Sequence, residues 1–489
     1  MDFEAQLAHI GEYGIVEEVK HPICVISGLY GARLSELVLF ETGEMGEVFL
    51  LDEDKVEILV LTKEAVRVGS RVTRMDKFLS VPVGDSLLGA IINPLGDSIT
   101  AKPYTKPKEE REIDPEPLGI SYRTKVRTPL LTGTALVDMM IPLGKGQKEL
   151  VIGDRKTGKT SFLMTAIKNQ VQQGSIGIYA AIGRRKSDIK KVEAFFEKEG
   201  IADKTIIVAT NSFDSPSLTY LTPYSAMTIA EYFRDKGQDV FVVFDDLSAH
   251  AKFYREVSLL AQRFPGRESY PGDIFYVHGK LMERTGNYLI NGKEVSISSL
   301  PVAELVEGDF TGYIATNLMG MTDGHIFFDS NIYYRGRRPA INISLSVTRV
   351  GRQAQSPLVR SINRELTAFL ALYEKMQNLS HFGAELTETV KNVLEMGEII
   401  YQFFEQHYTV VIPLPVQLVL LALLWLKMLD ETSLDAITEY RANLMTAYKD
   451  SVNKQLFEQL IEAKSFNDFL GAVAKQKDTL LALCKTKTK

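Results

Sequence analysis

One run of the sequence has the residue types and spacing of a loop that binds phosphate. Its pattern is GxxxxGK[ST], and the residues that fill or follow it are, in order, Gly153, Asp154, Arg155, Lys156, Thr157, Gly158, Lys159, Thr160 and Ser161. Glycines at such positions let backbone N–H groups converge on phosphate oxygens, and the start of a helix adds a favourable dipole. Lys159 is expected to reach the β and γ phosphates, and the hydroxyl of Thr160 to hold Mg²⁺. The run predicts a site for ATP or ADP with Mg²⁺.

A carboxylate at the end of an apolar run is the natural partner of such a loop. The run VFVVFDD occupies 240–246 and is typical of a buried strand, with Asp245 at its end. In phosphate-loop proteins an aspartate at this place lies beside the Mg²⁺. Because apolar runs ending in aspartate are common, the metal role of Asp245 depends on its pairing with the loop upstream.

The elements that must position these residues are typical of a parallel α/β domain. A helix-like segment at 161–174 directly follows the loop, and apolar runs alternate with helical segments at 149–153, 176–182, 205–210, 240–244 and 325–328. Before residue 90, short apolar runs separated by turns favour a small β-barrel. After Pro357 the strand pattern gives way to helical periodicity.

These patterns predict a multidomain chain. It comprises a β-barrel over 1–90, a central α/β P-loop (RecA-like) nucleotide-binding domain over 91–357 and an α-helical domain over 358–489. The 489 residues carry a net charge of −6 with both signs interspersed, so no nucleic-acid partner is expected. The longest apolar stretch, 410–426, is interrupted by two prolines and a glutamine and is too short to span a bilayer. It is typical of a loop that enters a buried helix, so we expect contact with a membrane only through other subunits.

Long phrases of the sequence resemble one family. They are GDRKTGKTS around the loop, FDDLSAHAKFYREVSLLAQRFPGRESYPGDIFYVHGKLMER after the apolar run at 240–244, and RRPAINISLSVTRVGRQAQ further along. Together they resemble the alpha subunit of F-type ATP synthases, which are rotary ATPases. The resemblance runs from the barrel into the helical domain.

The resemblance implies partners and a location. Such chains form a ring of three alpha-type and three beta-type subunits around a rotating gamma-type central shaft. The head lies on the cytoplasmic face of the membrane, and other subunits connect it to proton transport. Catalytic sites of the family lie mainly on the beta-type chains. The alpha-type chains complete these sites from across the interface and bind a largely unexchanging Mg-nucleotide of their own.

One position separates the alpha-type from the catalytic interpretation. In catalytic members, a Gly-Glu pair follows the strand after the loop helix, and the glutamate acts on the attacking water. Here the matching phrase is AIGRRKSD, in which Arg184 follows Gly183. An arginine cannot accept a proton at neutral pH. The chain is therefore expected to bind nucleotide without efficient hydrolysis, although Arg184 taken alone would be interpreted as a surface cation.

The third phrase supplies two further expectations. Arg349 matches the family's arginine finger, which stabilises charge on a phosphoryl group in the neighbouring subunit's site. Without the family match, Arg349 would be interpreted as an interface salt-bridge residue. Tyr333, Arg338 and Pro339 match the adenine-side pocket, with interface packing as the alternative. The nearby loop at 405–410 lacks the family's Tyr-x-Pro turn, which leaves a contact from this loop to the base open.

Other interpretations stay open at this level. Lys156 stands where alpha subunits have glutamine, and it could bind phosphate, pair with a carboxylate or face solvent. With such departures, the chain also resembles the F-type-like hydrolases of mycoplasma-like bacteria. One of these hydrolases powers gliding motility and does not serve ATP synthesis. A catalytic ring ATPase, whether a beta-type subunit, a secretion ATPase or a termination helicase, would need a carboxylate near position 184. The intact loop and Arg349 argue against an inert scaffold.

Overall fold

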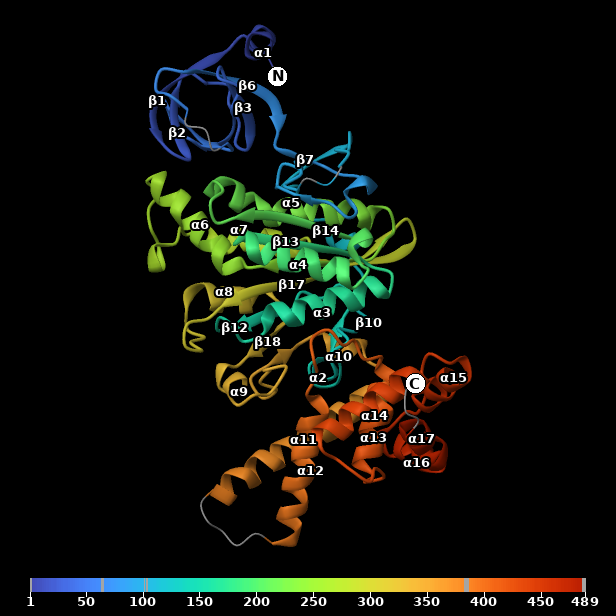
Figure 1. Cartoon of the computed structure of the whole chain (residues 1–489). Coiled ribbons are helices and arrows are strands. Elements are labelled where there is room, and N and C mark those ends of the chain that lie inside the picture. The colour runs from blue at the N-terminus through green and yellow to red at the C-terminus, as the bar shows by residue number, and fades with distance from the viewer. Residues whose placement is uncertain (1, 63–65, 101, 103, 382–386, 486–489) are drawn as a thin grey trace. The chain divides into compact units, whose positions relative to one another are not determined.

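The computed structural model describes residues 2–62, 66–100, 102, 104–381 and 387–485. The chain, which is drawn in Figure 1, forms two compact units. The first unit combines 1–124, 171–305 and 309–322, and the second combines 125–170, 306–308 and 323–489. Each unit therefore draws on segments that are far apart in the sequence.

The first unit begins with a closed β-barrel, as predicted. Its strands follow one another around the barrel in the order β1-β2-β5-β4-β3-β6. Mostly β-branched side chains, such as those of Val16 and Ile26, fill the interior together with Phe40. The elements are α1 (Phe3–Ile10), β1 (Tyr13–Lys20), β2 (Ile23–Ser27), β3 (Glu36–Phe40), β4 (Met45–Leu51), β5 (Val56–Val60) and β6 (Arg71–Phe78).

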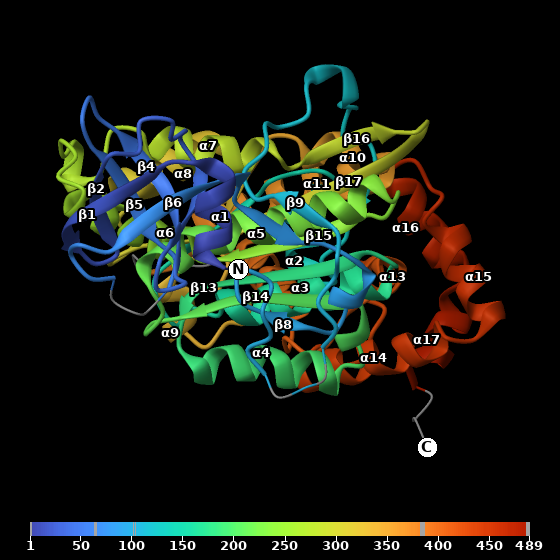
Figure 2. The same ribbon diagram turned by 90° about the horizontal axis from the view of Figure 1, so that it is seen from above.

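A mostly parallel sheet forms the centre of the first unit. The order of its strands is β17-β15-β13-β14-β8, and Figure 2 shows the last four side by side. Strand β16 pairs with β17 in the antiparallel direction. The bounds are β8 (Ile91–Ile92), β13 (Ile176–Arg184), β14 (Thr205–Asn211), β15 (Val240–Asp245), β16 (Gly286–Ile290) and β17 (Lys293–Glu304). Continuous apolar runs form β13, β14 and β15, because helices cover both faces of the sheet.

Helices α4 (Lys186–Lys198) and α5 (Pro216–Asp235) cover opposite faces of this sheet (Figure 1), as right-handed crossovers in opposite directions require. Val257 and Ala261, on and just after α6, pack against Ile23 and Leu59 of the barrel. The other elements are β7 (Ser80–Pro82), η1 (Asp85–Leu87), β9 (Glu110–Glu112), η2 (Ile120–Tyr122), η3 (Ala202–Lys204), α6 (Leu247–Leu260), η4 (Arg267–Ser269), α7 (Ile274–Glu283) and α8 (Tyr313–Met321).

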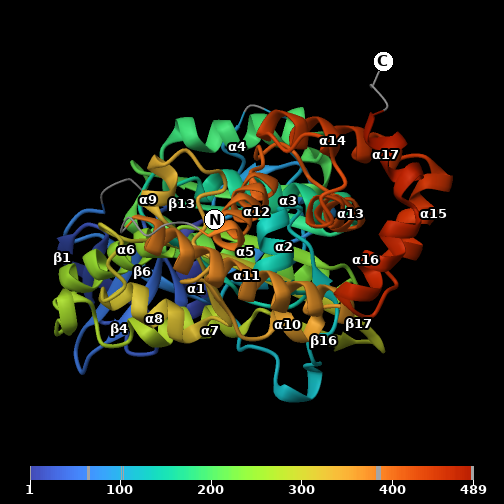
Figure 3. The ribbon, with the colours of Figure 1, turned by 90° about the horizontal axis from the view of Figure 1, so that it is seen from below.

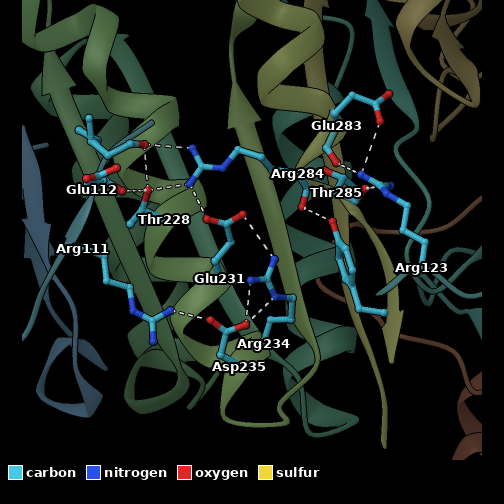
Figure 4. Close-up of polar contacts among 12 residues, drawn as sticks. Arg111, Glu112, Arg123, Thr228, Glu231, Arg234, Asp235, Glu283, Arg284 and Thr285 are labelled. Carbon is cyan, nitrogen blue, oxygen red and sulfur yellow. Dashed lines mark hydrogen bonds and ion pairs between the residues drawn. The ribbon is translucent and has the colours of Figure 1, made fainter. Parts of the chain in front are cut away.

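A buried ionic network ties α5 to the segment that follows α7 (Figure 4). The fully buried Arg284 lies 2.6 Å from the carboxylate of Glu231 and donates to Thr228 Oγ1 at 2.7 Å. Its other terminal nitrogen donates to the carbonyl oxygen of Ile113 at 3.0 Å. Arg234 approaches the second oxygen of Glu231 at 3.4 Å. Glu231 therefore balances two guanidinium groups that have little access to water.

The second unit contains the strand that leads into the phosphate loop. Strand β12 (Leu150–Gly153) pairs in parallel with β18 (Gly324–Phe328), which pairs in the antiparallel direction with β19 (Val347–Thr348). Helix α3 (Lys159–Gln172) begins inside the motif. The shorter elements are β10 (Pro129–Leu130), α2 (Ala135–Met140), β11 (Leu143–Gly144), α9 (Ser330–Tyr334) and α10 (Gly351–Ala354).

The rest of the second unit is helical. Helices α14, α17, α15 and α16 form an arc around α13, as Figure 3 shows. The bounds are α11 (Pro357–His381), α12 (Glu388–Phe404), α13 (Leu414–Trp425), α14 (Leu434–Ala447), α15 (Ser451–Leu460), α16 (Phe466–Lys475) and α17 (Lys477–Lys485). All residues of 415–424 in α13 are buried, so its apolar sequence serves the core. Among the described residues, none of the helices has both the length and the apolar character needed to cross a membrane.

The predicted fold class is confirmed: a β-barrel, an α/β nucleotide-binding region and a helical region are all present. The exact domain boundaries at 90 and 357 stay predictions. Strand β17, twelve residues long, was not expected from the sequence. Its segment KEVSISSLPVAE contains three serines and a proline, yet Ser298, Ser299 and Pro301 are all buried.

We predict that Glu231→Gln will strongly destabilise the first unit. The amide keeps the shape of the side chain but leaves the buried Arg284 without its charged partner, which typically costs about 3–5 kcal/mol. The measurement is the midpoint of thermal or urea unfolding. Asp85→Asn is a matched control, because it neutralises an exposed pair with Lys236 in the same unit. Equal midpoints for the two variants would contradict a stabilising role for the network.

Candidate nucleotide site

The phosphate loop connects the end of β12 to the start of α3. Gly153 has a φ angle of 152°, and a Cβ atom there would lie 2.2 Å from the carbonyl oxygen of Phe328. Gly158 has a φ angle of 100°. Residues other than glycine rarely adopt such φ angles. The path of the backbone therefore requires both glycines of the motif.

The ammonium group of Lys159 lies within the loop. The side chain is buried, and Nζ donates to the carbonyl oxygens of Gly153 and Asp154 at 2.7 and 2.5 Å. The hydroxyl of Thr157 donates to the same Asp154 carbonyl at 2.8 Å. The backbone carbonyls of the loop thus hold the Lys159 ammonium group within the loop. A cation at this place suits the binding of phosphate oxygens.

The outer side of the loop is open to solvent. Arg155, Lys156 and Thr160 are exposed, and Lys156 has a left-handed backbone with a φ angle of 63°. The carboxylate of Asp154 accepts a hydrogen bond from the backbone N–H of Gly308 at 2.9 Å, which anchors the start of the loop. Lys156 therefore faces solvent in this structure, and its contact with a bound phosphate stays a prediction.

A cavity of about 280 Å³ opens beside this loop. It brings together four segments that the sequence separates: Thr134 before α2, the phosphate loop with α3, the end of β18 with the segment after it, and the residues just after α12. Its lining residues are Thr134, Thr157, Gly158, Ser161, Phe162, Thr165, Phe328, Tyr333, Arg338, Pro339, Ala340, Gln406, His407 and Tyr408. Tyr333, Arg338 and Pro339, predicted for the adenine side, are therefore placed around the same cavity as Ser161 of the loop.

The aromatic wall of the cavity is held by a guanidinium group. Arg338 Nη1 donates to the carbonyl oxygen of Tyr333 at 2.7 Å, and its guanidinium carbon lies 3.5 Å from the centre of the Tyr333 ring. A cation over an aromatic face is attractive and limits the movement of both groups. The Tyr333 ring therefore has a fixed position at the edge of the cavity, where a flat base could contact it.

The segment at 406–410 closes the other side of the cavity, and the sequence had left its contribution open. The Gln406 side chain accepts from the Ala135 N–H at 3.0 Å and donates to the carbonyls of Gly133 and Val410 at 2.7 and 2.6 Å. Thr165 of α3 donates to the carbonyl oxygen of Tyr408. Hydrogen bonds to Gly133, Ala135 and Thr165, which are far away in the sequence, thus hold this segment, which lacks the family's proline turn.

Arg349 lies on a tightly packed turn after β19. Its backbone N–H donates to the carbonyl oxygen of Asp323 at 2.9 Å, and Thr348 Oγ1 donates to the carbonyl oxygen of Pro142 at 3.0 Å. A Cβ atom at Gly351 would lie only 1.7 Å from the same Pro142 oxygen. The Arg349 side chain is exposed. A fixed backbone therefore carries an arginine side chain that is open to solvent.

In the first unit, Arg184 contacts the aspartate that the sequence assigns to Mg²⁺. Its guanidinium group forms a close ion pair with one oxygen of Asp245. It also lies 3.2 Å from Asp246 Oδ2 and 3.8 Å from Glu304 Oε1. The hydroxyl of Tyr179 donates to the second oxygen of Asp245 at 2.6 Å. Both oxygens of Asp245 therefore already accept from groups of this chain.

Burial and charge fix the protonation of this group of residues. Burial opposes the charge of Arg184, but the attraction of Asp245 and Asp246 outweighs it and raises the pKa of the guanidinium. Burial raises the pKa of Asp246 to about 6, against the attraction of Arg184. Burial and the charge of Asp245 raise the pKa of Tyr179. At neutral pH, Arg184 is therefore charged and Tyr179 is protonated.

Comparison with known proteins agrees with this arrangement. Residues 133–348 match the model of the ATP synthase alpha/beta family, nucleotide-binding domain, and 355–476 match the ATP synthase alpha/beta chain, C terminal domain. An ATP synthase subunit alpha of Clostridium acetobutylicum is 37% identical over 96% of this chain and 93% of its own length. One from Sulfurovum sp. is 38% identical over 89% of this chain and 87% of its own length.

The chain belongs to the ATP synthase alpha/beta family, among its alpha subunits. The matched nucleotide-binding domain contains the phosphate loop and the side of the cavity at 333–340. The segment at 406–408 lies in the second matched domain of this alpha-type chain. The cavity thus joins two domains of the family, and no single motif in the sequence marks it.

We predict that Tyr333→Ala will weaken the binding of ATP by about tenfold, because a stacked base contributes about 1–3 kcal/mol. The measurement is calorimetric titration of the purified chain with ATP. Tyr334→Ala is the matched control, since the adjacent Tyr334 side chain is 85% exposed and does not line the cavity. An equal loss in both variants, or none in either, would contradict a stacking role for Tyr333.

Proposed function

We propose that this chain binds ATP or ADP in its own cavity without hydrolysing it efficiently and acts on catalysis in a neighbouring subunit. The observation that carries the proposal is Arg184 at the position where a catalytic chain of this family needs a carboxylate. A guanidinium group cannot take a proton from an attacking water. Because Arg184 is paired with Asp245, it is also unable to act as a mobile base or acid.

The nucleotide contacts follow from the loop and the cavity. Lys159 and the backbone of 153–158 bind the phosphates, with Ser161 at the start of α3 beside them. Tyr333, Arg338 and Pro339 hold the base. Mg²⁺ enters with the nucleotide, and the exposed hydroxyl of Thr160 is its proposed ligand on the loop. The metal supplies charge neutralisation for the phosphates.

The proposed partners follow from membership among the alpha subunits. Three copies of this chain alternate with three catalytic beta-type chains around a gamma-type central shaft. Arg349 extends into the catalytic site of the adjacent beta-type chain, where its planar fork stabilises charge on the transferring phosphoryl group. The exposed side chain and fixed backbone of Arg349 suit this role. The assembly meets the cytoplasmic face of a membrane only through other subunits.

We predict opposite effects for two variants of the assembled complex. Arg349→Lys should lower steady-state hydrolysis by about 10³ to 10⁵, because lysine keeps the charge but loses the paired contacts. Nucleotide binding by this chain should be unchanged. Lys159→Ala should abolish nucleotide binding by this chain, while the beta-type site keeps all its chemical groups. The measurements are phosphate release and bound nucleotide per complex, on assemblies confirmed by size.

Arg352→Lys is the matched control for this experiment, since Arg352 is an exposed arginine three positions further along. It should hydrolyse ATP at the wild-type rate. A loss of less than about tenfold for Arg349→Lys corresponds to ~1.4 kcal/mol and is the size expected of a surface ion pair. That result would reduce Arg349 to an interface residue and contradict the cross-subunit role.

A further inference from the structure

A buried arginine in the helical part of the second unit lies against the end of α12. The side chain of Arg441, on α14, is only 5% exposed. Its Nη1 donates to the carbonyl oxygen of Glu405 at 2.8 Å, and its Nη2 donates to that of Phe403 at 2.6 Å. Carbonyl groups at the end of a helix have no N–H partner within the helix. Arg441 therefore supplies the donors that the end of α12 lacks.

The charge of Arg441 also suits this position. The last turn of α12 has no basic residue of its own. A cation at the C-terminal end of a helix is attracted by the partial negative charge of the carbonyl groups there. Burial lowers the pKa of Arg441 to about 10, and the negative charge of Glu405 opposes that decrease. The guanidinium group therefore stays charged at neutral pH and makes charge-assisted hydrogen bonds.

The end of α12 continues directly into the wall of the nucleotide cavity. Gln406 lines the cavity, and its backbone N–H donates to the carbonyl oxygen of Arg338 at 2.8 Å. Arg338 in turn holds the ring of Tyr333, the proposed contact for the base. Arg441 thus fixes one end of a short stretch of chain that contacts the base side of the cavity. Its described hydrogen bonds go to the end of α12 and not to the phosphate loop.

A general contribution to stability is the other interpretation of Arg441. A buried cation loses its hydration, so its replacement by an apolar side chain of similar volume is often neutral for stability. The replacement does, however, leave the carbonyl groups of Phe403 and Glu405 without their donors, which is unfavourable beside buried side chains. The end of α12 must move for these groups to find other donors, and Gln406 moves with it. The expected change is therefore local and lies beside the base.

We propose that Arg441 is a positioning residue for the side of the cavity that binds the base. This inference rests on the proposed nucleotide binding and gives the helical domain a share in holding the base. The guanidinium group fixes the end of α12, and the end of α12 places residues 406–408 against the segment around Arg338. Binding of the phosphates depends on the loop at 153–160 and does not require Arg441.

The first test compares the binding of two ligands, ATP and inorganic tripolyphosphate, to the purified full-length chain by calorimetry with Mg²⁺. Arg441→Met should weaken ATP binding by about tenfold, because the base loses part of its wall, and should change tripolyphosphate binding by less than about twofold. Arg441→Lys keeps the charge but loses the planar fork, so its ATP affinity should lie between the two. Arg364→Met, which removes an exposed arginine of α11, is the control and should match the wild type.

A double-mutant cycle with Tyr333→Ala locates the effect. In a chain that already lacks the Tyr333 ring, Arg441→Met should weaken ATP binding by less than about threefold. Equal losses for ATP and tripolyphosphate, additive effects of the two substitutions, or an ATP affinity of Arg441→Met within about twofold of the wild type would each overturn the inference. Arg441→Lys takes the place of Arg441→Met in these comparisons if the methionine variant does not fold.

Hydrogen–deuterium exchange of the nucleotide-free chain separates this inference from the proposed function. The amides of 403–410 should exchange faster in Arg441→Met than in the wild type, because the end of α12 opens more often. Their exchange should be unchanged in Arg364→Met. Absence of ATP binding by the wild type would refute the proposed function, and exchange would still show whether Arg441 holds this segment. Unchanged exchange in Arg441→Met would overturn the inference.

Discussion

The ion pair between Arg184 and Asp245 constrains much of what this chain can do. Two segments 61 residues apart meet at the carboxyl ends of neighbouring strands, where buried carboxylates need a cation. A guanidinium group meets that need permanently, since it does not titrate near neutral pH. In the proposed function, the same arginine stands where a catalytic chain would need a proton acceptor. The side chain of Arg184 thus neutralises buried carboxylates and also accounts for the proposed lack of hydrolysis by this chain.

The cavity depends on a different kind of constraint, the hydrogen-bonding of backbone groups. Gln406 bridges Gly133 and Val410, and Thr165 of α3 fixes the carbonyl of Tyr408. These contacts join the helical domain to the loop helix within one compact unit. Because backbone groups buried without partners are costly, the segment has little freedom to move away. These contacts therefore fix the wall of the cavity that residues 406–408 form.

The sequence predicts the parts of this structure that are local. Neighbouring residues alone are enough to recognise a glycine-rich loop between an apolar strand and a helix. The buried strands β13, β14 and β15 are likewise recognised as apolar runs. Strand β17 was not predicted because its serines interrupt the apolar pattern. Ser299 can be buried there because its hydroxyl accepts a hydrogen bond from Thr285, which lies outside the strand. The contribution of Gln406 was left open because its partners lie some 270 residues away. The pairing of Arg184 with Asp245 depends on strand order, which composition does not specify.

The most direct test of the account is the fate of ATP on the isolated chain. A stoichiometric amount of labelled ATP is added with Mg²⁺ to the purified chain, and acid-quenched samples are followed over time. The account predicts that the ATP is bound and recovered unhydrolysed over many minutes. Hydrolysis at an ordinary enzymatic rate of about 10 per second by the isolated chain would contradict it.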